Sequence, residues 1–287
     1  MLIKKSSLFR FLSDKTYIKL KYFIRFKRRI NLTNPKTFNE KVNWLKLYDR
    51  KDIYTIMVDK YEAKRYVSNI IGDKYIIPTY GIYNSFNEID FNMLPNQFVI
   101  KCTHDSGGLV VVKNKKYLNI ENAKKIIEKS LNSNYYYDNR EWPYKNVKPR
   151  IIIEKYMEDE KTNELRDYKF FCFDGKPKIM FIAFDRAIHK TKFNFYDMDF
   201  NMLNFKQHYP NFDIDLIKPK TFEKMKKIAA KLSKGIPHLR VDLYEINGKI
   251  YFGELTFSHF GGFVPFDPKE WDLKLGKMLD ISKVGEK

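Results

Sequence analysis

The stretch LRVDLYEINGKIYFGELTF (residues 239–257) decides the fold. Apolar residues alternate with polar ones on both sides of an Asn-Gly pair, a pattern that predicts a β-hairpin closed by a tight turn. Side chains alternate faces along a strand, so Arg240 and Asp242 share one face. Pairing at the turn then brings Glu254 of the second strand toward Asp242. Two carboxylates beside a guanidinium suit a divalent metal that holds phosphates, and a surface ladder of salt bridges is the alternative.

A second informative stretch is FVIKCTHDSGGLVVVK (residues 98–113). It predicts a strand, a short loop containing Ser106-Gly107-Gly108, and a second strand. Glycines in such a loop let backbone N–H groups approach a phosphate closely, and Lys101 points the same way. The Walker spacing is absent and a strand follows, which excludes a helix-opening P-loop. An ordinary hairpin turn is the alternative.

Composition limits the classes of protein. The 287 residues are 44% hydrophobic and 16% aromatic, which indicates a folded chain of one large domain or two to three lobes. Two cysteines inside apolar runs fit neither a disulfide framework nor a zinc site and favour a reducing cytoplasm. We find no membrane-spanning apolar run and no signal peptide. The net charge of +19 is spread along the chain, which favours an anionic substrate and, less strongly, a non-catalytic nucleic-acid binder, an alternative that we do not expect.

The first 30 residues form a basic amphipathic segment that we expect to be helical. It suits contact with a membrane surface, an acidic partner or a biosynthetic complex, and an ordinary surface helix with snorkelling lysines is the alternative. Thr37 and Glu40 match a capping box that opens a helix. The other expected elements are helices over 53–70, 119–132 and 221–232, strands over 75–83, 149–157, 167–173 and 177–183, and loops over 132–148 and 257–262.

The order of these elements resembles the TupA-like ATP-grasp family, named for teichuronopeptide biosynthesis. The resemblance is carried by NPKTFNEKVNWLKLYDR (34–50), FVIKCTHDSGG (98–108), PRIIIEKYM (149–157), RDYKFFCFDGKPK (166–178) and the hairpin stretch. It implies an α+β ATP-grasp fold, in which two α+β lobes with antiparallel sheets clasp ATP, plus a helical N-terminal region. The expected ranges are the basic N-terminal segment (1–30), an N-terminal helical and strand lobe (31–95), and the N-terminal (96–150) and C-terminal (151–287) ATP-grasp subdomains.

The resemblance also implies ATP and Mg²⁺ as cofactors, with roles for individual residues. The implied ATP-binding residues are Lys101, Ser106, Gly107, Gly108, Glu154, Lys155, Tyr156 and Lys169. The implied metal ligands are Asp242, Glu254 and Thr256, the last being a poorer ligand than the Asn often found there in ATP-grasp ligases. Arg240 and Lys169 are the implied catalytic groups. The residues proposed to hold substrate are Lys60, Arg65, His104, Arg186 and His259, although each histidine could instead hydrogen-bond loop backbone.

The function implied is an ATP-dependent carboxylate-amine ligase that works through an acyl phosphate. It would join an amino acid or amine to a sugar-acid carboxylate, as part of an acidic glycan in cell-surface or capsular polysaccharide biosynthesis. The expected location is the cytoplasm, peripheral to the inner membrane face. Such chemistry needs no protein nucleophile, and the sequence has no G-x-S-x-G or Cys/His signature. The alternative is a glycosyltransferase of the same pathway, for which Asp197 and Asp199 have the D-x-D spacing.

Overall fold

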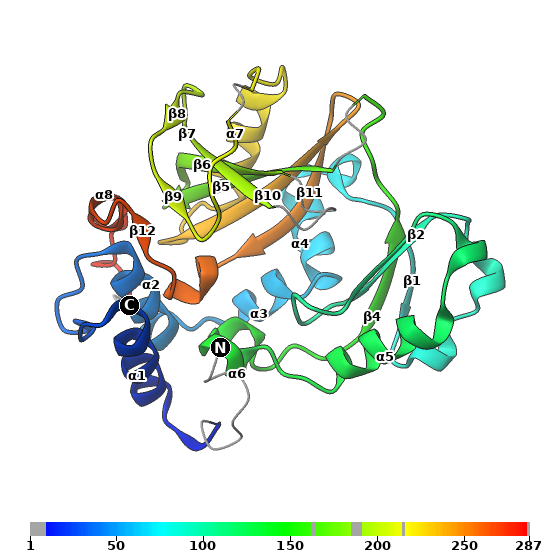
Figure 1. Cartoon of the computed structure of the whole chain (residues 1–287), viewed down its shortest axis with the longest axis horizontal. Coiled ribbons are helices and arrows are strands. Elements are labelled where there is room, and N and C mark those ends of the chain that lie inside the picture. Colours follow the sequence, from blue (N-terminus) through cyan, green and yellow to red (C-terminus); the bar gives the residue numbers. More distant parts are fainter. Residues whose placement is uncertain (1–9, 162–164, 185–190, 214–215, 286–287) are drawn as a thin grey trace.

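Two antiparallel sheets form the framework of the computed structural model, which describes residues 10–161, 165–184, 191–213 and 216–285 (Figure 1). The first sheet has the strand order β1-β4-β2-β3. Its strands are β1 (Thr79–Tyr83), β2 (Phe98–Cys102), β3 (Leu109–Val112) and β4 (Ile151–Lys155). Helix α5 (Ile120–Leu131) packs on this sheet, where its Ala123 and Ile127 lie in one core with Ile100.

The second sheet has six strands in the order β11-β10-β5-β6-β7-β8. Their bounds are β5 (Arg166–Phe173), β6 (Lys176–Phe184), β7 (Lys192–Asp197), β8 (Met202–Leu203), β10 (Leu239–Ile246) and β11 (Lys249–Thr256). Helix α7 (Phe222–Leu232) covers one face, and its Met225 and Ala229 lie in one core with Phe170 and Val241. The predicted α+β class with antiparallel sheets is therefore confirmed.

The other face of the six-stranded sheet is apolar at one end and polar at the other. At the apolar end, Phe171 and Phe181 pack in one core with Phe38 of α2 (Phe38–Tyr48) and Leu275 of α8 (Glu270–Met278). A short pair, β9 (Lys206–Gln207) with β12 (Phe266–Asp267), lies in the same region. At the polar end the same face carries charged side chains, and that end forms the site described below.

The N-terminal helices differ from expectation in one place. The capping box at Thr37 and Glu40 is present and opens α2. The continuous helix predicted over 53–70 is wrong, because the chain forms α3 (Asp52–Val58) and α4 (Glu62–Ile71) with a break between them. Asp59 causes the break, since its Oδ1 accepts the backbone N–H groups of Tyr61 and Glu62 at 2.8 and 3.1 Å and so restarts the helix. The remaining helices are α1 (Asp14–Phe26) and α6 (Tyr136–Asn139).

Two other predicted segments need correction. The strand predicted over 75–83, with a break at its proline, is shorter, because Asp73–Tyr75 forms a 3₁₀ turn and β1 begins at Thr79, directly after Pro78. The loop predicted over 132–148 contains α6 and a 3₁₀ turn at Trp142–Tyr144. The four predicted ranges of the chain stay predictions. The first sheet combines strands from three of these ranges, because β4 pairs with β1 on one side and with β2 on the other.

The hairpin contains a β-bulge that decides which side chains meet. Ile246 pairs with Lys249 around the Asn-Gly turn, and this register holds as far as the pair Leu243 and Phe252. Regular pairing would next place Gly253 opposite Asp242 and turn Glu254 to the other face. Instead Gly253 is skipped, and Glu254 stands directly opposite Asp242.

Candidate active site

Three carboxylates and two cations meet at the polar end of the six-stranded sheet. Arg240 Nε donates to Asp242 Oδ1, and its Nη2 donates to Asp242 Oδ2, both at 2.7 Å. The same Nη2 donates to Glu254 Oε1 at 2.7 Å. Lys169 Nζ contacts Asp242 Oδ2 and lies 2.5 Å from Asp167 Oδ2. The two-point contact fixes the guanidinium plane against the sheet.

This cluster carries one more negative than positive charge when all five groups are ionised. Asp242 is fully buried, and burial raises the pKa of its carboxyl to about 6 although Arg240 and Lys169 act in the opposite direction. The Glu254 side chain is 42% exposed. Burial of its carboxyl group would raise its pKa, but Lys169 and Arg240 outweigh that effect and lower the pKa. The excess negative charge therefore rests on the residue that faces solvent.

His259 lies behind Arg240. Arg240 Nη1 donates to His259 Nδ1 at 3.0 Å, and His259 Nε2 donates to Gln207 Oε1 at 2.9 Å. Because a guanidinium can only donate, Nδ1 must be the acceptor and the imidazole must be neutral. Burial and then the charge of Arg240 lower the pKa of His259 well below its usual value. His259 therefore hydrogen-bonds the side chains of Arg240 and Gln207 and helps to orient Arg240. The alternative role, hydrogen bonding to loop backbone, is not the one these two ring nitrogens have.

A second charged cluster lies on the first sheet. Glu154 of β4 is buried, with Lys101 Nζ 2.6 Å from its Oε2 and Lys64 Nζ in contact with its Oε1. Burial would raise the pKa of Glu154, but Lys101 and Lys64 outweigh it and lower the pKa to about 2. Lys64 also donates to Ile77 O at 2.7 Å and to Thr79 Oγ1 at 2.8 Å. Both carboxylate oxygens of Glu154 are therefore engaged by cations.

The glycine-containing loop between β2 and β3 is closed by its own aspartate. The Asp105 carboxylate accepts the Gly108 N–H at 3.0 Å. A Cβ atom at Gly108 would lie 2.6 Å from Cys102 Sγ, so only glycine lets the loop pack this closely. Lys60 Nζ donates to Cys102 O at 3.0 Å and to Asp105 O. Ser106 and Gly107, by contrast, are exposed at the tip.

A small pocket lies beside the cluster on the six-stranded sheet. Its lining includes Lys60 from the break between α3 and α4, Tyr144 from the 3₁₀ turn, and Gly253 and Glu254 from β11. The Lys60 ammonium feels the charge of Glu254 on one sheet and of Lys101 on the other. Lys60 therefore lies near charged residues of both sheets, Glu254 of the second sheet and Lys101 of the first.

The family model described as TupA-like ATP-grasp matches residues 40–280. The chain belongs to the TupA-like ATP-grasp family. This is the family that the order of motifs implied. A search among curated proteins found no match.

Solved structures similar to this TupA-like ATP-grasp chain are distant. The D-alanine–D-alanine ligase from Helicobacter pylori is 16% identical, with 85% of this chain and 69% of that chain covered and a TM-score of 0.47. The D-alanine–D-alanine ligase from Bacillus anthracis complexed with ATP is 16% identical, covers 70% of this chain and 55% of that chain, and has a TM-score of 0.41. D-cycloserine synthetase DcsG is 14% identical over 79% of this chain and 72% of that chain, with a TM-score of 0.39.

The ATP-binding residues inferred for this TupA-like protein fall into two groups. Lys101 and Glu154 belong to the cluster on the first sheet, whereas Lys169 belongs to the cluster on the second. The Lys155 N–H donates to Pro78 O at 2.9 Å, so this backbone group already has a partner. Tyr156 is partly buried, and its ring centroid lies 5.5 Å from Lys113 Nζ.

The residues proposed to hold substrate are not brought together. Lys60 is held by backbone carbonyls, as described above. Arg65 is exposed on α4 and forms no ion pair with any residue that the structure describes. His104 Nε2 lies 3.1 Å from Ser130 O and 3.2 Å from Ser133 O, which is the backbone hydrogen bonding that was its alternative role. Arg186 lies outside the described residues.

The metal ligands inferred for this family member are a pair rather than a complete shell. Within the described ranges, no three His, Cys, Asp or Glu side chains converge as a metal-binding group. Asp242 and Glu254 nonetheless stand opposite each other, and Mg²⁺ commonly takes one or two carboxylates with its other ligands from phosphates and water. Thr256 Oγ1 donates to Glu254 Oε1 at 3.3 Å and so orients that carboxylate. The donor chemistry fits Mg²⁺ once Lys169 releases Asp242 Oδ2.

Three residues of the two clusters were not predicted. Asp167 and Lys169 alternate as charged residues in an otherwise apolar strand, a sequence signal that would have placed Asp167 beside Lys169. Lys64 follows Ala63 on a helix whose orientation the sequence does not fix, and on this helix the sequence analysis named Arg65, as a substrate contact. Gln207 lies on a two-residue strand that has no periodic pattern at all.

Proposed function

We propose that this protein forms an amide by the ATP-dependent ligation of a carboxylate and an amine. A carboxylate oxygen attacks the γ-phosphorus of ATP, and ADP leaves. The amine nitrogen then attacks the carbonyl carbon of the acyl phosphate, the C–O bond breaks, and inorganic phosphate departs with the loss of one proton from nitrogen. Phosphorylation is needed because a carboxylate by itself is a poor electrophile.

One observation carries this proposal: Lys60 borders a pocket together with Glu254 of β11, and its ammonium group also lies within electrostatic reach of Lys101 of β2. Lys60 is electrostatically coupled to Glu254 and to Lys101, which belong to different sheets. Phosphoryl transfer is catalysed mainly by positioning and by neutralising charge on the phosphates, and this arrangement supplies such groups from two sides.

The roles proposed for individual residues follow from their positions. Lys101 contacts the α- and β-phosphates, and the Ser106–Gly108 loop closes over them. Glu154 binds the adenine amino group, and the backbone of Lys155 and Tyr156 borders the adenine edge. Lys169 provides a second phosphate contact, and Arg240 stabilises the transferred phosphoryl group because its guanidinium is held rigidly by Asp242 and His259.

Asp242 and Glu254 are the residues proposed to hold Mg²⁺, with Thr256 orienting Glu254. When bound there, Mg²⁺ would neutralise charge on the β- and γ-phosphates. The cluster suits a divalent cation because it has an excess negative charge and because Glu254 is its solvent-facing member.

The substrates proposed are a sugar-acid carboxylate of an acidic glycan and an amino acid or amine, in cell-surface polysaccharide biosynthesis in the cytoplasm. The net charge of +19 supports an anionic substrate. The glycosyltransferase alternative has less support. Asp197 Oδ1 accepts the backbone N–H groups of Asp199 and Asn201 at 2.9 and 2.8 Å, so this aspartate stabilises its own turn.

Isothermal titration of ATP in the presence and absence of Mg²⁺ tests the nucleotide site. We expect magnesium-dependent binding that Lys101→Ala weakens by roughly tenfold or more, since a hydrogen bond to a charged group contributes about 1.5–3 kcal/mol. Glu254→Gln should remove most of the dependence on Mg²⁺. Lys116→Ala, which removes an exposed cation elsewhere on the chain, is the matched control. Binding of a nucleotide sugar but not of ATP would favour the transferase instead.

The surface of α1 supports the proposed contact with a membrane. Tyr17, Ile18 and Tyr22 are buried against the protein, and the opposite face of the helix is exposed. The exposed apolar residues are Leu20, Phe23 and Ile24. Their basic neighbours, which form no ion pair with any described residue, are Lys15, Lys19, Arg25 and Lys27. Within the described ranges every helix is too short or too polar to span a bilayer. We propose that this face lies on the anionic inner surface of the membrane.

Co-sedimentation with lipid vesicles tests this contact. The protein should bind vesicles that contain phosphatidylglycerol, and it should bind pure phosphatidylcholine weakly because the basic residues then lack their counter-charge. Replacing Phe23 and Ile24 by serine should weaken binding by roughly tenfold or more, since both side chains lose apolar burial. Met93→Ser, at an exposed position far from α1, serves as the control. Equal binding by all three proteins would contradict the proposal.

A further inference from the structure

Glu141 is a buried carboxylate that forms no ion pair with any residue that the structure describes. The residue is 3% exposed, and its hydrogen-bond partner among the described residues is Asn139, whose Nδ2 donates to Oε1 at 3.1 Å. Burial raises the pKa of Glu141 to about 7, and the more distant Lys46 lowers it only in part. A buried acid that lacks an ion-pair contact is costly to the fold, and such groups concentrate at functional sites.

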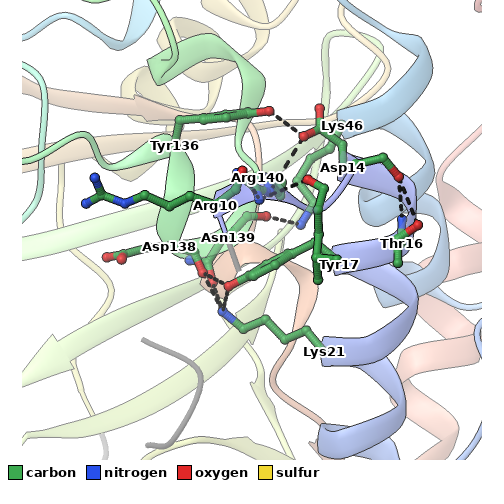
Figure 2. A network of polar contacts seen from close by, with 12 residues as sticks. Arg10, Asp14, Thr16, Tyr17, Lys21, Lys46, Tyr136, Asp138, Asn139 and Arg140 are labelled. Atoms are coloured by element: carbon green, nitrogen blue, oxygen red, sulfur yellow. Dashed lines mark hydrogen bonds and ion pairs between the residues drawn. The ribbon is translucent and has the colours of Figure 1, made fainter. Parts of the chain in front are cut away.

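The two residues that precede Glu141, Asn139 and Arg140, belong to a network of polar contacts (Figure 2). Asn139 Oδ1 accepts from Lys21 Nζ at 2.6 Å, which turns its Nδ2 toward Glu141. Lys46 Nζ donates to Asn139 O at 2.8 Å and to Gly261 O at 2.7 Å. Arg140, which precedes Glu141, has a left-handed backbone with φ of 57°. Such a conformation in a non-glycine residue persists only where the surroundings impose it.

The Arg140 side chain supplies those surroundings. It is 1% exposed, and its guanidinium lies 4.6 Å from the ring centroid of Tyr17 and 5.2 Å from that of Tyr136. Its Nη2 also donates to Leu12 O at 3.2 Å. Contacts of Arg140 with Tyr17 of α1 and Tyr136 of α6 therefore stabilise the turn that positions Glu141.

Glu141 lies one turn from a residue that lines the pocket, because Tyr144 N–H donates to Glu141 O at 3.1 Å and Tyr144 borders the pocket with Glu254. Its charge acts on the hydroxyl of Tyr135, which lies next to the Ser106 side chain of the glycine-containing loop. It also acts on Tyr144, which lines the pocket with Glu254. Arg240 acts on Glu141 in turn. The charged or titratable groups around it are therefore Lys21, Lys46, Tyr135, Tyr144 and Arg240.

We propose that Glu141 binds the amine substrate as its ammonium form and accepts the proton that the nitrogen must lose before it attacks. This inference rests on the proposed ligase function and names a catalytic residue for its second step. One N–H bond breaks and its proton passes to a Glu141 carboxylate oxygen, so that the nitrogen lone pair is free. The C–N bond then forms as the acyl–oxygen bond breaks, and phosphate takes the electron pair.

The test compares two nucleophiles in the wild-type protein and in Glu141→Gln. Glutamine keeps the acceptor for the Asn139 hydrogen bond but cannot take a proton. Hydroxylamine is uncharged at neutral pH and needs no base, whereas glycine and other amino acids are ammonium ions. ATP, Mg²⁺ and glucuronate or galacturonate are supplied in both assays, which follow hydroxamate formation and amide formation. Glu128→Gln, on an exposed stretch of α5, is the matched control.

We expect Glu141→Gln to leave hydroxamate formation unchanged and to lower amide formation by roughly 100-fold, the range of a positioned general base. This deficit should shrink as the pH rises, because more of the amine is then free base. Equal losses with both nucleophiles, or no loss with either, would overturn the assignment of Glu141. If the wild type makes no hydroxamate from any uronic acid, the proposed sugar-acid activation fails instead.

Thermal unfolding examines the buried acid without substrates. The folded-state pKa of about 7 lies above the usual value of 4.5. The folded state therefore binds more protons in this interval, and the wild type loses stability as the pH rises through it. Glu141→Gln removes that loss. The melting temperature of the variant minus that of the wild type should therefore increase between pH 5 and pH 8. A constant difference would mean that Glu141 is not the buried titrating acid that the proposal requires.

Discussion

Replacing Arg240 by methionine lowers the free energy of unfolding by about 3–5 kcal/mol, the cost typical of removing one partner from a buried ion pair. Asp242 is fully buried and receives two hydrogen bonds from this guanidinium, which leaves Lys169 as its remaining cationic partner. Methionine fills much of the same space without charge, so the loss is electrostatic and not a cavity. Urea unfolding at neutral pH measures it.

Two further variants separate charge from geometry. Arg240→Lys should recover part of the stability but not all, since an ammonium cannot make the two-point contact with Asp242. Adding Asp242→Asn to Arg240→Met should restore stability relative to Arg240→Met alone, because the buried charge is then removed with its partner. A double variant less stable than Arg240→Met alone would mean that the ion pair between Arg240 and Asp242 does not stabilise this end of the sheet.

Gly253→Val destabilises the hairpin by about 1–3 kcal/mol, the usual cost of forcing atoms into a packed site. A Cβ atom at Gly253 would lie 3.0 Å from the Asp242 carbonyl oxygen and 3.1 Å from Cε2 of Tyr244. The strand can avoid this clash only by abandoning the bulge. In the regular register Glu254 would then pair with Val241 and face the apolar core, so magnesium-dependent ATP binding should be lost as well.

Deleting Gly253 is the matched control for this prediction. The deletion removes the bulge, yet counting from the Asn-Gly turn it leaves Glu254 opposite Asp242 in a regular hairpin. We expect the deletion variant to retain more magnesium-dependent ATP binding than Gly253→Val, as measured by titration calorimetry. The reverse order would mean that the bulge itself, and not the facing of the carboxylates, is required.

Local signals in the sequence predicted much of the fold. The capping box at Thr37 and Glu40 marks the start of α2, and the Asn-Gly turn marks the hairpin, because both depend on residues close in the chain. The helix over 53–70 was wrong for the opposite reason. The carboxylate of Asp59 breaks it while also binding Arg150 at 2.9 Å, a partner 91 residues away.

The site was predictable only in part. Arg240, Asp242 and Glu254 were expected to meet, and they do. Lys64 could not be chosen over Arg65, because the choice depends on which face α4 turns toward Glu154. Glu141 carried no signal, since a single acid in a Tyr-rich segment resembles surface sequence until α1, α2 and α6 bury it.

The sequence by itself determined the family, the two antiparallel sheets and the residue types of the charged clusters. The order of motifs implied the family and, through the resemblance, the two lobes with antiparallel sheets, whereas alternation and turn residues predicted the hairpin and its charged residues. The tertiary structure decided which of those side chains face one another. The hairpin shows the reason: regular pairing from the Asn-Gly turn would place Glu254 on the core face, and the bulge at Gly253 turns it toward Asp242. That bulge depends on contacts across strands, with the Asp242 carbonyl and the Tyr244 ring packed against a residue that has no side chain.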